Sequence, residues 1–134
     1  NGGTADGVVI GGTTAAAGTF TAGTFTTAVA STETDTTNSG SITLDFSADQ
    51  NFVLTLTGNV TLANPSTEAV GQTGVIVCIQ DGTGSRTLSL GTDYETAGGA
   101  GITLSTAASA VDVIPYFVKA SGSIQLGAPQ LAFS

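Results

Sequence analysis

Acidic side chains are the residues of this chain best suited to chemistry. The sequence has ten of them, against two basic residues, one cysteine and no histidine. Asp93 and Glu95 are two positions apart and could share one face of a strand, and a glycosidase requires two carboxylates that face one cleft. They lie, however, in a Gly- and Thr-rich stretch, residues 91–99, that is typical of a loop. We therefore interpret them as solvated loop carboxylates rather than as a catalytic pair.

The sequence lacks most of the residue types that nucleophilic catalysis and metal binding need. Without histidine, Ser/His/Asp and Cys/His arrangements and histidine-rich zinc sites are excluded. Cys78 lies in an apolar run, residues 74–80, which predicts a buried small hydrophobic residue rather than a reactive thiol. Calcium would need oxygen ligands, which Asp45 with Asp49, or Asp81 with loop carbonyls, could supply. Neither set has the spacing of an EF-hand, so we predict no catalytic residue, metal or cofactor.

The two tyrosines offer one other kind of site, because sugar rings stack on exposed aromatic side chains. Tyr116 lies inside an apolar stretch, and we expect it to pack in the core. Tyr94 lies in the predicted loop between Asp93 and Glu95. These three residues are therefore a candidate surface for recognising a glycan, although a solvated loop is the interpretation we favour.

Composition and charge exclude two classes of partner. Charged residues make up 9% of the 134 residues, against roughly 25% in typical soluble domains, and the hydrophobic share of 40% is not that of a disordered chain. Net charge is −8, with Arg86 and Lys119 as the only cations, so we expect neither nucleic acid nor an anionic membrane as a partner. No apolar run approaches the length of a spanning helix or a signal-peptide core.

Two zones precede the regular part of the chain. Residues 1–27 are rich in Gly, Ala and Thr and repeat the sequence Ala-Gly-Thr-Phe-Thr at 17–21 and 22–26, which predicts an extended segment with tight turns. Residues 28–41 have almost no large apolar side chains and predict a linker. The large apolar side chains of the first zone need partners, so we predict an oligomer interface formed by Val8, Val9, Ile10, Phe20 and Phe25.

Residues 42–134 have the pattern of a β-domain. Apolar and polar residues alternate over 42–46 and 52–57, and residues 58–59, Gly-Asn, predict a two-residue turn. Residues 75–79 are apolar on both faces, as in a central strand. With the later segments, about eight or nine short strands spaced by roughly 8–12 residues predict an all-β fold, a small antiparallel sandwich or jelly roll.

Several of these motifs resemble bacteriophage fibre and appendage proteins. Residues 9–21, Val-Ile-Gly-Gly-Thr-Thr-Ala-Ala-Ala-Gly-Thr-Phe-Thr, resemble an Ile-Gly-Gly-x-Thr/Ser-Pro-Ala-Ala-Gly-x-Phe-Thr-Thr element that precedes a distal domain in that family. Ala15 stands where the family commonly has proline. The order of strands and turns in the family's distal domain is similar to that of residues 54–65, 71–77, 81–88 and 111–118.

This resemblance implies a non-enzymatic structural protein of a phage virion, located at the particle surface: a tail fibre, head fibre or capsid-decoration module. It implies a homotrimer that contacts other capsid or tail proteins, with the N-terminal segment attaching or trimerising and the β-domain projecting outward. The small residues of 1–27 agree, since they let three chains approach closely at an axis.

Two alternatives stay open. One is a glycan-binding receptor-recognition tip, which an exposed aromatic cluster in a groove would favour. The other is a secreted filament subunit in which residues 1–27 donate a strand to a neighbour. The chain begins at Asn1 rather than at a methionine, and we expect it to be a processed product, an expressed fragment or the ordered part of a longer protein.

Overall fold

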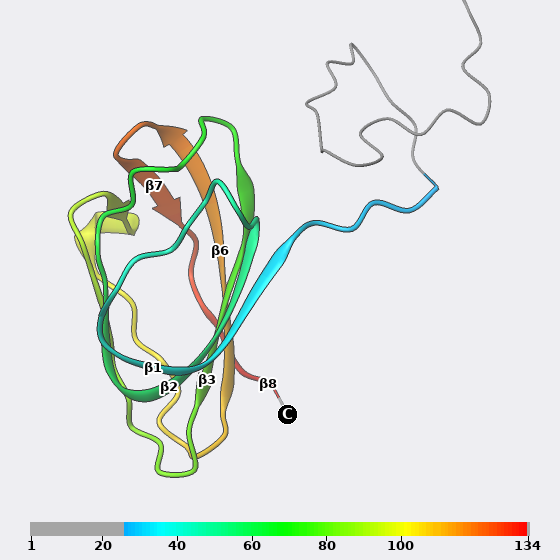
Figure 1. The fold of residues 1–134 in the computed structure, drawn as a ribbon. Coiled ribbons are helices and arrows are strands. Elements are labelled where there is room, and N and C mark those ends of the chain that lie inside the picture. Colours follow the sequence, from blue (N-terminus) through cyan, green and yellow to red (C-terminus); the bar gives the residue numbers. More distant parts are fainter. Residues whose placement is uncertain (1–25, 134) are drawn as a thin grey trace, which may run out of the picture.

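A single, strongly curled β-sheet makes up the fold (Figure 1). The computed structural model describes residues 26–133. Its eight strands are β1 (Thr32–Ile42), β2 (Asn51–Leu62), β3 (Thr73–Gln80), β4 (Leu88–Leu90), β5 (Tyr94–Glu95), β6 (Val111–Ala120), β7 (Ser123–Leu126) and β8 (Gln130–Phe133). Besides these strands, the described residues form one 3-10 turn, η1 (Ala97–Gly99), and none of them forms a helix that could cross a membrane. The all-β prediction is confirmed.

The strand order gives a mixed half-barrel. The sheet runs β1-β2-β3-β6-β7-β5, while β4 pairs with β2 and β8 pairs with β6. The β1–β2, β2–β3, β2–β4 and β5–β7 pairs are parallel, whereas β6 is antiparallel to β3, β7 and β8. This curled sheet takes the place of the antiparallel sandwich or jelly roll that the sequence predicted. Alternation shows which side chains face a core, but it says nothing about the direction of the neighbouring strand.

The parallel pairs arise because the chain circles the core and returns beside itself. Phe52 at the start of β2 lies level with Ile76 of β3, so one circuit separates the two strands. The long strand β2 bends, and its second half pairs with β4, where Val60 lies level with Leu88. Parallel strands are usually joined by a helix. Here short connections that run around the curl, rather than helices, join the successive parallel strands.

The linker expected over residues 28–41 is replaced by strand β1 from Thr32 onward. This strand has few apolar side chains, so the sequence pattern did not reveal it. Its backbone pairs with β2, and the buried Asn38 side chain donates a 3.2 Å hydrogen bond to the carbonyl of Thr55. Backbone pairing and one satisfied amide therefore hold a segment that has almost no hydrophobic side chains.

Two further local predictions differ from the structure. Strand β1 ends at Ile42, so the alternating residues Leu44 and Phe46 belong to a connection, yet both are buried as their alternation predicted. The turn predicted at residues 58–59 is absent, because β2 runs through both positions. The pattern therefore identified the core residues correctly and the strand ends incorrectly.

The core fills the concave side of the sheet. An aromatic cluster at its centre has ring centroids 5.0 Å apart between Phe46 and Phe52, and 5.3 Å apart between Phe46 and Tyr116. The expected burial of Tyr116 and Cys78 is confirmed. Alternate strand residues complete the core, which includes Leu54, Leu56, Leu62, Ile76, Ile114, Val118 and Ile124.

Candidate functional site

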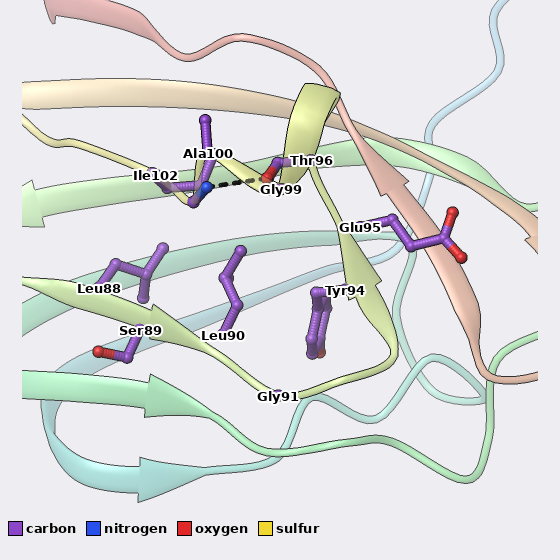
Figure 2. A pocket seen from close by; sticks show the side chains of 11 residues that line it. Leu88, Ser89, Leu90, Gly91, Tyr94, Glu95, Thr96, Gly99, Ala100 and Ile102 are labelled. Atoms are coloured by element: carbon purple, nitrogen blue, oxygen red, sulfur yellow. Dashed lines mark hydrogen bonds between the residues drawn. The ribbon is translucent and has the colours of Figure 1, made fainter.

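An open hollow of about 690 Å³ lies between β4 and the segment that follows β5 (Figure 2). Within the described sheet, β4 pairs with β2 and β5 pairs with β7, so each of these two short strands has a single neighbour. The hollow therefore marks the place where the half-barrel stays open. Its lining combines apolar side chains with a polar set, and includes Leu88, Leu90, Tyr94, Ile102, Ser89, Glu95 and Thr96.

A tight turn between β4 and β5 positions one side of this hollow. The side chain of Asn64 holds the turn: its amide donates to the Thr92 hydroxyl at 2.8 Å, and its carbonyl oxygen accepts from the Asp93 N–H at 3.1 Å. Gly91 begins the turn, and its N–H donates to the Leu62 carbonyl at 2.7 Å. A β-carbon on Gly91 would overlap the Asn64 side chain, so only glycine allows this close approach.

The three predicted recognition residues lie together in sequence but differ in their surroundings. Tyr94 is only 5% exposed and packs in the core, so its ring is not a stacking platform. Asp93 is half-buried, and its main-chain carbonyl accepts a 2.8 Å hydrogen bond from the N–H of Ile124. Glu95 is exposed at the edge of the hollow. The structure thus leaves one exposed member of the predicted set.

Glu95 is held by the strands beside it. Its two carboxylate oxygens accept hydrogen bonds from the Ser123 hydroxyl at 2.8 Å and from Lys119 Nζ at 3.1 Å. These contacts, the Ser123 hydrogen bond first, lower the pKa of Glu95. In Figure 2 the carboxylate points away from Leu88 and Leu90. Among the described residues that line the hollow, Glu95 alone is acidic, so the hollow does not present a carboxylate pair.

Near β5 lie two buried polar atoms that no pattern in the sequence predicted. The Tyr94 hydroxyl and one carboxylate oxygen of Glu68 are both buried without a hydrogen-bond partner in the described part of the chain. The other Glu68 oxygen accepts a 2.8 Å hydrogen bond from the N–H of Gly122. Burial, followed by the charge of Glu68, raises the pKa of Tyr94 well above its usual value. The tyrosine therefore stays neutral.

The remaining candidates for chemistry are occupied by local contacts. Cys78 is 1% exposed, and burial raises the pKa of its thiol to about 12, so the thiolate is not available at neutral pH. Asp81 forms an ion pair of 2.7 Å with Arg86, and Asp45 accepts hydrogen bonds from the N–H and hydroxyl of Ser47. In residues 26–133 no three His, Cys, Asp or Glu side chains group in a way that could hold a metal ion.

Residues 42–123 match a family model whose description is "Putative phage tail fibre C-terminal domain". The match covers more than half of the chain and runs from the last residue of β1 to the first residue of β7. The chain belongs to this phage tail fibre domain family. The predicted resemblance to bacteriophage fibre proteins is confirmed. No curated protein and no solved structure matches the chain.

The sheet of this tail fibre domain extends beyond the residues that match the family. Nearly all of β1 precedes residue 42, and β8 follows residue 123, yet β1 pairs with β2 and β8 pairs with β6. The hollow, by contrast, is lined entirely by residues inside the matched range. The predicted interface residues Val8, Val9, Ile10, Phe20 and Phe25 lie outside the described residues.

Proposed function

We propose that this tail fibre domain is a non-enzymatic structural module of a phage virion, exposed at the particle surface and assembled as a homotrimer. The family match over residues 42–123 is the observation that carries the proposal. Its partners are copies of itself and neighbouring virion proteins. Its role is to form a stable fold whose surface contacts these partners.

The way in which the loops are held supports a structural role. The buried side chain of Gln80 forms two hydrogen bonds with the backbone of the loop that follows β3, as a neighbouring strand would. Its amide donates to the Arg86 carbonyl at 2.9 Å, and its oxygen accepts from the Arg86 N–H at 2.8 Å. Gln72 likewise donates to the carbonyls of Phe46 and Asp49, both at 3.1 Å. Side-chain amides thus replace backbone partners in the loops, where water would otherwise compete.

The particle itself provides the direct test of location. Antibodies raised against the chain, imaged by electron microscopy on intact phage, should label the tail fibres. Labelling confined to the head would contradict a tail fibre role and would favour the head-fibre or capsid-decoration modules. The oligomeric state is a separate test. Light scattering on the full chain at micromolar concentration should give about three times the 13.0 kDa chain mass, and a monomer would contradict the trimer.

Recognition of a host glycan is the second candidate, and the open hollow beside Glu95 and Thr96 favours it. The burial of Tyr94 removes the aromatic platform on which that alternative first rested. A glycan array probed with the full chain and with Glu95→Gln would test it. If the chain binds a glycan and Glu95→Gln weakens that binding, a receptor-recognition tip is supported. If the chain binds no glycan, only the structural role stands. Strand donation by residues 1–27 concerns a segment of which residues 1–25 lie outside the described residues.

A further inference from the structure

The convex side of the sheet carries an apolar surface that the described chain does not cover. We call it the outer face. In β3, Ile76 and Cys78 point into the core. The residues that alternate with them point outward and remain partly exposed: Val75, Val77 and Ile79. The same alternation in β6 buries Ile114 and turns its neighbours outward. The outer face consists of Val53, Val75, Val77, Ile79, Val111, Val113, Phe117 and Phe133.

The strand register joins these side chains into continuous rows. Val77 of β3 lies directly opposite Val53 of β2 on one side and Val113 of β6 on the other. Side chains at directly opposite positions of neighbouring strands share one face of the sheet and contact each other. In the next row, Val111 lies between Ile79 and Phe133. The outer face is therefore one surface that crosses four strands.

Strands with this composition are normally covered on both sides. A sheet that meets water on one face carries polar side chains there, whereas a strand that is apolar on both faces is buried on both. The described fold covers only the inner side of β3 and β6. Phe117 and Phe133 are 46% and 50% exposed, and they are among the most exposed large apolar side chains of residues 26–133. The pattern therefore requires a second covering surface.

Charge indicates what that surface is. No charged residue occurs in the rows that cross β2, β3 and β6 at the outer face, although the chain carries a net charge of −8. In a chain with this net charge, an uncharged surface lets two copies approach with less ionic repulsion than a surface that carries carboxylates. Neutral polar residues border the face at β1 and β8, where Thr34 lies beside Val53 and Gln130 lies opposite Val113. Beyond Phe117 the border is the ion pair of Lys119 with Glu95, whose two charges offset each other. An apolar centre with a polar rim is the usual anatomy of a subunit interface.

We infer that the outer face is buried against other copies of this chain in the assembled fibre. This inference rests on the proposed homotrimer and assigns a surface to it, because an identical copy offers the same uncharged apolar area. It places subunit contacts in β2, β3, β6 and β8 of the β-domain, in addition to those predicted for residues 1–27. Phe117 and Phe133 then supply the aromatic anchors that oligomer interfaces favour.

The test places a charge at the centre of the outer face of the full chain. Val77→Lys should weaken assembly by about 100-fold or more, because each copy would bury an unpaired cation at the interface. Thr61→Lys is the matched control, since Thr61 is an exposed residue in the second half of β2 and lies away from the outer face. Sedimentation over a concentration series should show monomers for the first variant and the wild-type mass for the second.

Three outcomes separate this inference from the trimer itself. If Val77→Lys keeps the wild-type mass, the outer face is not the interface, and the trimer stands without it. If the wild type is a monomer, both proposals are overturned. If Val77→Lys fails to fold, Val77→Thr preserves the branched shape, and its dissociation should still increase by about tenfold for the loss of apolar contact. An unchanged dissociation constant in the threonine variant would then overturn the inference.

A labelling experiment tests the same surface in the native assembly. Because Cys78 is buried, a cysteine placed at the surface is the accessible thiol of the chain. Phe117→Cys should react with a maleimide about tenfold or more slowly than Thr61→Cys at concentrations where the chain assembles, since burial at the interface removes the thiol from solvent. Dilution to monomers should restore the rate. Equal rates at high concentration would overturn the inference.

Discussion

The hydroxyl of Tyr116 donates a 2.6 Å hydrogen bond to the main-chain carbonyl of Gln50, so β6 is joined to the residue that precedes β2. The Tyr116 ring meets Phe46 edge to face. Gly74 of β3 lies beside this contact, and a β-carbon on it would overlap the Gln50 carbonyl. The hydroxyl of Tyr116 is therefore satisfied where β3 and β6 meet the start of β2, whereas the hydroxyl of Tyr94 has no hydrogen-bond partner among the described residues.

This contrast predicts opposite responses to the same substitution. Tyr116→Phe should lower the free energy of unfolding by about 1–3 kcal/mol, because it leaves the Gln50 carbonyl without its donor. Tyr94→Phe should leave that free energy unchanged or raise it by up to about 1 kcal/mol, because it removes a buried hydroxyl that forms no hydrogen bond with any described residue. Urea denaturation of both variants beside the wild type makes the comparison. Similar losses in the two variants would contradict it.

The buried carboxylate of Asp112 predicts a second effect on stability. It accepts hydrogen bonds from the N–H and hydroxyl of Ser105, both at 2.7 Å, and from the N–H of Ala132 in β8 at 2.8 Å. Asp112→Asn turns a donor toward these donors, so we expect a loss of about 1–3 kcal/mol in the free energy of unfolding. Amide exchange at Ala132 should also become faster. Asp93→Asn in the turn between β4 and β5 is the control: among the described residues its carboxylate accepts only a long hydrogen bond of 3.4 Å, from the Thr92 hydroxyl, so the substitution should change neither quantity.

The ion pair of Asp81 with Arg86 predicts a dependence on pH. The hydrogen bond from Arg86 lowers the pKa of Asp81 from 3.8 to about 2. Because the folded-state pKa is the lower one, the contribution of Asp81 to stability is present above about pH 4 and disappears as the pH falls toward 2. Melting temperatures of the wild type and Asp81→Asn should therefore differ at pH 5 and converge near pH 2. A constant difference across this range would contradict the assignment.

The burial of Cys78 predicts a thiol that reports unfolding. With its pKa raised to about 12 and almost no exposed surface, the side chain should not react with a thiol reagent at pH 8 while the sheet is intact. In urea it should react fully, and at intermediate concentrations its rate should follow the rate of unfolding measured by circular dichroism. Rapid labelling of the folded chain would show that the core opens locally at β3.

Some expectations from the sequence failed for identifiable reasons. The residues of β1 carry mostly Thr, Ser and acidic side chains, and such a pattern gives no apolar alternation, so the strand was interpreted as a linker. Tyr94 was assigned to a loop because glycines and threonines surround it, but it lies in β5 beside Ile124 of β7, which is distant in sequence, and both side chains belong to the core. In both cases the deciding contacts come from other circuits of the chain.

The sequence by itself determined the all-β class, the inward residues of β2, the burial of Cys78 and Tyr116, the exclusion of histidine-based chemistry, and the resemblance to phage fibre proteins. Each of these depends on residue types or on a period of two, and both can be seen in the chain alone. The parallel winding, the place of β1, the burial of the Tyr94 hydroxyl and the continuous outer face were decided by the tertiary structure. Backbone hydrogen-bonding groups are the same at every residue, so the path of the chain chooses which strands pair and in which direction.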